Sequence, residues 1–161
     1  MSKLIYITNE EKKKIFSFAQ KIIEDAHTNK KSSWKLRSNY NVKSICIGTL
    51  GEYGYGKMTG QKVNMKLESR GDGGIDFIDG AQVKTCTYNG IGKKELKVNN
   101  LFGGKKPKKY VLAFYDSNAK NNFVTLIGEI SYENFINKKK IKTYNGKSVY
   151  VVDETQLDKL Y

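Results

Sequence analysis

Histidine, cysteine and proline are scarce in this chain of 161 residues, which has one histidine, two cysteines and one proline. A single histidine excludes paired-histidine catalysis, a three-histidine zinc site and most histidine–cysteine metal patterns. Two cysteines, Cys46 and Cys86, are too few for the disulfide framework of a small secreted domain. We therefore expect free thiols in a reducing, cytoplasmic compartment.

Long apolar stretches are also missing. The longest purely apolar run, Tyr110 to Tyr115, is far shorter than the ~20 residues that a membrane-spanning helix needs. Lys12 to Lys14 are not followed by an apolar segment, so no secretory signal is predicted. The length fits one domain over 1–161, which we divide into an N-terminal helix and basic loop (1–43), a core (44–130) and a C-terminal extension (131–161).

Acidic residues are few compared with basic ones. Sixteen Asp and Glu face 29 Lys and Arg, which gives a net charge of +13 and a pI near 9.6. This balance favours a polyanionic partner, of which nucleic acid is the commonest. A solvated lysine surface without a partner is the alternative. A membrane surface is less favoured, because no basic amphipathic helix stands out.

Two helices are expected in the first sixty residues. Residues 9–28 carry an apolar stripe at helical spacing, and Thr8 followed by Glu11 forms a capping-box signature. Residues 44–59 also have helical spacing, although they contain four glycines. Each glycine costs a helix about 1 kcal/mol relative to alanine. We still predict a helix there, because glycines allow a helix to pack closely against another backbone.

Strands dominate the rest of the chain. We expect strands at 63–68, 74–78, 81–88, 110–116, 123–130 and 149–152, a short helix at 131–138 and a helical turn at 154–160. The continuous apolar run at 110–116 suits a buried central strand. The predicted fold class is α/β, with a mixed central β-sheet flanked by helices.

One segment places an acid, an amide and a lysine on neighbouring strands. If the connecting loop is Ile78-Asp79-Gly80, Phe77 pairs with Ala81 and Asp76 lies opposite Gln82. Asp76, Gln82 and Lys84 then share one polar face, whereas a two-residue loop would turn Asp76 away. Three-residue hairpin loops prefer glycine in a left-handed conformation at their last position, and Gly80 is there. The sequence therefore favours the register that groups these side chains.

An acid, a short turn and Gln-x-Lys on the next strand resemble the PD-(D/E)XK nuclease superfamily. The pattern is most similar to the variant of Mrr-type restriction endonucleases, in which glutamine replaces the second acid. The resemblance covers roughly residues 45–130 and implies a restriction-endonuclease-like fold and metal-dependent cleavage of DNA. The family adds a glutamate from a preceding helix, and Glu52 is in the right place. Compact members commonly work as homodimers.

The resemblance also implies a role for each residue. Asp76 would be the central ligand of Mg²⁺, for which Mn²⁺ could substitute, and Glu52 would supply a second carboxylate. The Gln82 amide oxygen and the Val83 carbonyl would complete the oxygen donors that such a cation prefers. Lys84 would stabilise the charge that develops on the phosphate or orient the attacking water. Glutamine in place of an acid lowers the negative charge of this site.

Each candidate also has an ordinary structural explanation. The carboxylate of Asp76 could flank a turn, and Gln82 and Lys84 could be the polar side of a strand. Glu52 could lie on a helix surface, with Glu68 as the next candidate for the extra carboxylate, and Asp72 and Asp79 are expected to be turn residues. Two other functions stay open: a non-catalytic nucleic-acid-binding module, and a basic interaction or inhibitor protein with an acidic partner.

Lysines are concentrated after the Gln-x-Lys pattern. We expect seven of them to bind nucleic acid: Lys93, Lys94, Lys97, Lys105, Lys106, Lys108 and Lys109. A second group follows near the C-terminus: Lys138, Lys139, Lys140, Lys142 and Lys147. Only two arginines are present, so these clusters suit contacts with phosphates better than the reading of base edges.

Overall fold

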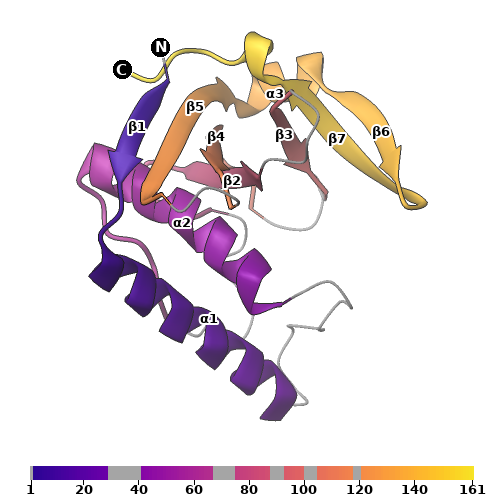
Figure 1. Ribbon diagram of the computed structural model, residues 1–161. Coiled ribbons are helices and arrows are strands. Elements are labelled where there is room, and N and C mark those ends of the chain that lie inside the picture. Colours follow the sequence, from indigo (N-terminus) through magenta and orange to yellow (C-terminus); the bar gives the residue numbers. More distant parts are fainter. Residues whose placement is uncertain (1, 29–40, 67–74, 88–92, 100–104, 118–120) are drawn as a thin grey trace.

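A computed structural model describes residues 2–28, 41–66, 75–87, 93–99, 105–117 and 121–161 (Figure 1). Its elements are β1 (Lys3–Tyr6), α1 (Asn9–Thr28), α2 (Val42–Thr59), β2 (Ala81–Thr87), β3 (Glu95–Val98), β4 (Lys109–Tyr115), β5 (Phe123–Ser131), α3 (Tyr132–Lys138), β6 (Lys140–Tyr144), β7 (Lys147–Asp153) and a 3₁₀ turn (Glu154–Gln156). The predicted α/β class is confirmed. None of the helices in these ranges is long and apolar enough to span a membrane.

The described elements form stacked layers. The main sheet has the strand order β1-β5-β4-β2, with β2 parallel to β4 and the other neighbours antiparallel. Helix α2 covers one face of this sheet, and α1 lies outside α2 (Figure 1). A second antiparallel sheet, β3-β7-β6, and the short helix α3 cover the other face. Helices were expected on both faces of the sheet. They cover one face, whereas among the described residues the other face is covered by the second sheet and only one short helix.

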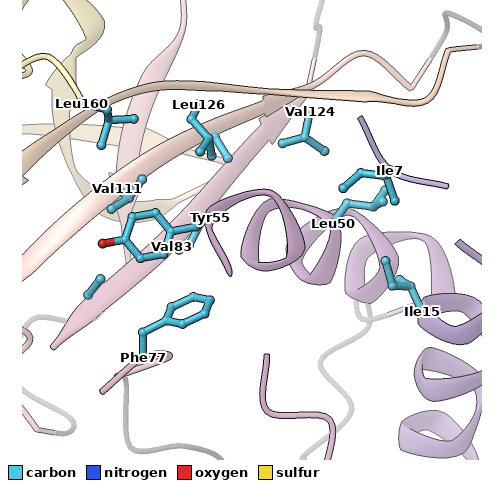
Figure 2. Packing of buried hydrophobic residues seen from close by; sticks show 12 residues of the cluster. Ile7, Ile15, Leu50, Tyr55, Phe77, Val83, Val111, Val124, Leu126 and Leu160 are labelled. Atoms are coloured by element: carbon cyan, nitrogen blue, oxygen red, sulfur yellow. The ribbon is translucent and has the colours of Figure 1, made fainter. Parts of the chain in front are cut away.

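Two apolar clusters lie on the two faces of the main sheet. On the α2 side, Leu50 and Tyr55 pack against strand residues such as Val111 and Leu126 (Figure 2). On the other side, Tyr110, Leu112 and Ile130 of the main sheet form a cluster with residues of α3 and the second sheet, namely Phe135, Leu96, Val98 and Val152. Alternate residues of β4 thus face opposite sides of the sheet, which explains why this strand is apolar from Tyr110 to Tyr115.

Both long helices are present where the sequence predicts them. The capping box of α1 is formed, because the Thr8 N–H donates to Glu11 Oε2 at 2.7 Å and the Glu11 N–H donates to Thr8 Oγ1 at 3.1 Å. Helix α2 begins after Asn41, whose side chain accepts a hydrogen bond from the Ser44 N–H. It ends at Gly60, which has a left-handed backbone with φ of 71°.

Several strand predictions are wrong in position. Residues 63–66 and 75–78 are not in strands, and the rest of the predicted strands 63–68 and 74–78 lies outside the described residues. Three strands were not predicted: β1, β3 and β6. Each has only four or five residues and contains lysine, so its apolar alternation is too short to stand out. The helical turn expected at 154–160 is limited to 154–156.

Candidate functional site

The turn before β2 has the predicted loop residues, but the strand pairing that would put Asp76 opposite Gln82 is not formed. The Phe77 N–H donates to the Ala81 carbonyl at 3.3 Å, and the Gly80 N–H donates to the Phe77 carbonyl at 2.9 Å. Gly80 has φ of 83°, as expected for the last residue of a three-residue loop. The Ala81 N–H donates to Asp79 Oδ1 at 3.1 Å, so Asp79 is a turn residue as predicted.

Asp76 lies at the outer edge of β2. Its main-chain N–H donates to the Ala81 carbonyl at 3.0 Å, and its Oδ2 accepts a hydrogen bond of 2.6 Å from the Val83 N–H. The carboxylate thus takes the place that a carbonyl of a neighbouring strand would occupy. This explains why residues 75–78 follow the edge of β2 without forming the predicted strand. The N–H and C=O of one strand residue point to the same edge, so the Val83 carbonyl points to the edge where Asp76 lies.

Gln82 and Lys84 share the face of β2 that is turned toward the second sheet. Gln82 pairs with Tyr110 and Lys84 with Leu112 in the parallel ladder, and residues paired in this way have side chains on the same face. Tyr110 and Leu112 belong to the cluster beneath the second sheet. Both predicted site residues are half-buried. Val83 points the other way, toward Tyr55 and Phe77 (Figure 2).

Glu52 belongs to α2, which covers the opposite face of β2. Helix α2 crosses β2 at Thr85, whose Oγ1 donates to the Gly48 carbonyl at 3.3 Å. A Cβ atom at Gly51 would lie 1.9 Å from the same Oγ1. Glu52 follows Gly51 and is half-buried. The structure joins Asp76 to Val83 and places Gln82 and Lys84 on one face, but it puts α2 on the other face.

Oxygen donors, rather than a clustered set of acids, define this region. Over the described ranges, no group of three or more His, Cys, Asp or Glu residues could hold a metal ion. The predicted donor set has only two acids, Asp76 and Glu52, and it takes its other oxygens from the Gln82 amide and the Val83 carbonyl. Such oxygens suit a hard divalent cation. Glu68, the other candidate for a second acid, lies outside the described residues.

A network of polar side chains supports the turn from behind, and the sequence analysis did not predict it. The Tyr55 hydroxyl donates to Asp79 Oδ2 at 2.6 Å. Lys109 Nζ lies 3.8 Å from the same Asp79 oxygen and donates to Glu129 Oε2 at 2.8 Å. These residues come from α2, the turn, β4 and β5, so no local pattern could reveal the network. It connects the turn that carries Asp76 to three elements of the core.

The ionisation of this network follows from its hydrogen bonds. Burial, and then the hydrogen bond to Asp79, raise the pKa of Tyr55 to about 12. Burial also raises the pKa of Asp79, but the hydrogen bonds from Tyr55 and from the Ala81 N–H outweigh it, so the pKa lies below its ordinary value. Burial lowers the pKa of Lys109, whereas its hydrogen bond to Glu129 outweighs this effect and raises the pKa to about 12. At neutral pH the network therefore holds a neutral phenol, a carboxylate and an ammonium.

The predicted nucleic-acid-binding lysines differ in their surroundings. Lys93, Lys105, Lys106 and Lys108 are exposed. Three others contact side chains of the fold: Lys94 Nζ is 4.0 Å from Glu154, Lys97 Nζ lies 4.3 Å from the centre of the Tyr144 ring, and Lys109 pairs with Glu129.

The basic segment 105–109 borders the turn. The Lys108 N–H donates to the Gly80 carbonyl at 2.8 Å, and a Cβ atom at Gly80 would lie 2.7 Å from Lys108 Cγ. Three exposed lysines, Lys105, Lys106 and Lys108, therefore lie in the segment that adjoins the Asp76 turn.

The cysteine on this strand is not an activated nucleophile. Burial raises the pKa of the Cys86 thiol to about 11, so the thiol stays protonated near neutral pH. What remains for chemistry is a carboxylate, an amide, a main-chain carbonyl and a lysine.

No protein-family model matches the chain, and no curated protein or solved structure matches it either.

Proposed function

We propose that this chain is a metal-dependent endonuclease that hydrolyses phosphodiester bonds in DNA. The proposal depends mainly on the Asp76 carboxylate, which accepts a hydrogen bond of 2.6 Å from the Val83 N–H. Val83 lies between Gln82 and Lys84 in the sequence of β2. A carboxylate is the kind of oxygen ligand that a hard divalent cation prefers. Asp76, Gln82 and the Val83 carbonyl would hold Mg²⁺ or Mn²⁺, and Glu52 would add a carboxylate around the edge of β2.

The cation would act as a Lewis acid and lower the pKa of a bound water. The protein's own residues position the reactants. The Val83 N–H orients the Asp76 carboxylate, because a hydrogen bond to one oxygen fixes the direction of the other. Lys84 shares a face with Gln82, so its ammonium would meet the phosphate held there and stabilise the charge that develops during hydrolysis.

The charge of the surface favours a polyanionic substrate. The net charge is +13, and exposed Lys105, Lys106 and Lys108 lie in the segment that is hydrogen-bonded to the Asp76 turn. Lysines contact phosphates without reading sequence. We place the reaction in the cytoplasm, which agrees with the free thiols of Cys46 and Cys86. One site cuts one strand, so we propose a homodimer for cleavage of both strands of a duplex.

Replacing Asp76 by asparagine tests this function most cleanly. The Asp76→Asn side chain keeps an oxygen that can accept from the Val83 N–H, so the fold should survive, but it removes the ligand's charge. We expect the wild type to cut plasmid or branched DNA in Mg²⁺ or Mn²⁺, and the variant to bind DNA without cutting it. Glu24→Gln, at an exposed position of α1, is the matched control and should cut like the wild type.

The outcomes separate the candidate functions. Wild-type cleavage rates in the Asp76→Asn variant would show that the site is elsewhere. A wild type that binds DNA but cuts none of these substrates in either metal would make the chain a non-catalytic binding module. Circular dichroism and urea unfolding of each variant ensure that a loss of cleavage is not a loss of folding.

A further inference from the structure

The β6–β7 hairpin projects from the layered body of the protein (Figure 1). All five residues of β6 are exposed, as are the first two residues of β7. Tyr144 pairs with Lys147 across a two-residue turn, in which Asn145 and Gly146 have φ of 48° and 75°. Positive φ at both positions is typical of the type I′ turn, which gives a tight and regular two-stranded ribbon.

Positive charge is concentrated on this ribbon. Residues 140–152 of the hairpin carry three lysines and no acid, and Lys138 and Lys139 directly precede them, which makes five. Three of these lysines contact other parts of the fold: Lys138 and Lys139 donate to main-chain carbonyls, and Lys142 pairs with Glu95. Lys140 and Lys147 are exposed, and their side chains make no hydrogen bond or ion pair with any described residue. Their charges therefore remain available to a partner.

The lysines of the ribbon lie on its outer face. Lys140, Lys142 and Tyr144 alternate along β6, and Lys147 pairs with Tyr144, so the four side chains share one face. Lys97 of β3 lies over the Tyr144 ring at 4.3 Å and belongs to the same face. The opposite face of this sheet carries Leu96, Val98 and Val152, which are buried against the main sheet. The lysine face, which also carries Val151 and Glu95, is therefore turned away from this core.

We propose that the β6–β7 hairpin is an arm that lies along the major groove of duplex DNA, with Lys140 and Lys147 on the phosphates. Two strands about 4.8 Å apart form a ribbon that fits a groove about 12 Å wide, whereas the minor groove is only about 6 Å wide. Lysines suit phosphates, which position a protein on a duplex. The choice of DNA as the partner depends on the proposed function, but the arm requires only binding and not cleavage.

A pair of double variants separates the arm from general electrostatic attraction. Lys140→Gln/Lys147→Gln removes two charges from the ribbon. Lys13→Gln/Lys14→Gln removes two exposed charges from α1, which lies in the outermost layer on the other side of the main sheet. Both variants have the same net charge, so any long-range loss of attraction is equal.

The measurement is fluorescence anisotropy with a 20-base-pair duplex in EDTA, repeated over a range of NaCl concentrations. Each lost phosphate contact reduces the slope of log K against log salt by ~0.9. For the hairpin variant, we expect the magnitude of this slope to be smaller than that of the wild type by up to ~1.8. The α1 variant should keep the wild-type slope. With a single-stranded oligonucleotide of the same length, the hairpin variant should lose less.

The other outcomes overturn the arm or the function separately. Equal slopes for the two double variants would refute the arm, and aggregation of the hairpin variant would then show that its lysines only protect the exposed edge of β6. Equal losses on duplex and single strand would refute the major groove. A wild type that binds the duplex without cutting it would refute the nuclease function. The arm would then still be tested by the salt dependence of binding of the two double variants. A wild type that binds no duplex refutes both.

Discussion

Two glycines of α2 should respond in opposite ways to the same substitution. A Cβ atom at Gly48 meets no described atom within 4 Å, whereas one at Gly51 would lie 1.9 Å from Thr85 Oγ1 and 3.1 Å from the Cβ of Ala113. Gly48→Ala therefore changes only the helix propensity. Gly51→Ala forces α2 away from the sheet at the point where the helix crosses β2.

The structure gives the size of both effects. Alanine in place of glycine stabilises a helix interior by about 1 kcal/mol, and Gly48→Ala should show this gain in full. Rotation of Thr85 could move its Oγ1 away from a new methyl at position 51, but it would break the 3.3 Å hydrogen bond to the Gly48 carbonyl and leave the Ala113 contact. Overpacking costs about 1–3 kcal/mol. After the propensity gain, we expect Gly51→Ala to be destabilised by up to about 2 kcal/mol.

Thermal unfolding followed by circular dichroism measures the difference. The free energies of unfolding should differ by about 1–3 kcal/mol between the two variants, which corresponds to a separation in Tm of about 2–12 °C for a domain of this size. Gly48→Ala should melt above the wild type and Gly51→Ala below it. Equal shifts, or a stabilised Gly51→Ala, would refute the close contact between α2 and β2.

The remaining predictions concern the turn and the site. Tyr55→Phe should cost about 1.5 kcal/mol, the low end for a hydrogen bond to a charged group that water can reach. Because the pKa of Asp79 lies below its ordinary value, the loss of unfolding free energy should have its full size at pH 7 and become smaller as the pH falls through that pKa. Urea unfolding of the variant and the wild type at pH 7 and pH 3 measures this change. Gln82→Glu should lower the Mg²⁺ concentration for half-maximal cleavage, and Gln82→Leu should raise it. If neither variant changes that concentration, Gln82 is not a metal ligand. Lys84→Ala should slow single-turnover cleavage by a factor of about 10²–10³, and an unchanged rate would exclude a catalytic lysine.

The sequence predicted the parts of the fold that depend on local chemistry. The capping box of Thr8 and Glu11 located α1, and the glycine-rich helix was found because its apolar spacing outweighed its propensity. The Asp79-Gly80 turn was predicted, since glycine and an Asx side chain specify such a loop, but the strand pairing expected from it is absent. In each case the decisive residues are neighbours in the chain.

Longer-range arrangements were beyond the sequence. An apolar pattern could not show that Asp76 would fill the edge of β2 with its side chain, which replaces the predicted strand 74–78. The Tyr55–Asp79–Lys109–Glu129 network joins four separate elements. Nor could the sequence assign α2 and Gln82 to opposite faces of β2, because that depends on which side of the sheet each layer occupies.

The position of a bound divalent cation tests the central claim most directly. We suggest crystals of the Lys84→Ala variant with a DNA duplex, soaked in Mn²⁺, whose anomalous scattering locates the ion. The account predicts a peak at the outer edge of β2, within coordination distance of an Asp76 carboxylate oxygen and the Val83 carbonyl. An ion bound at the DNA but away from Asp76, or an Asp76 carboxylate that binds no ion in the presence of DNA and Mn²⁺, would contradict it.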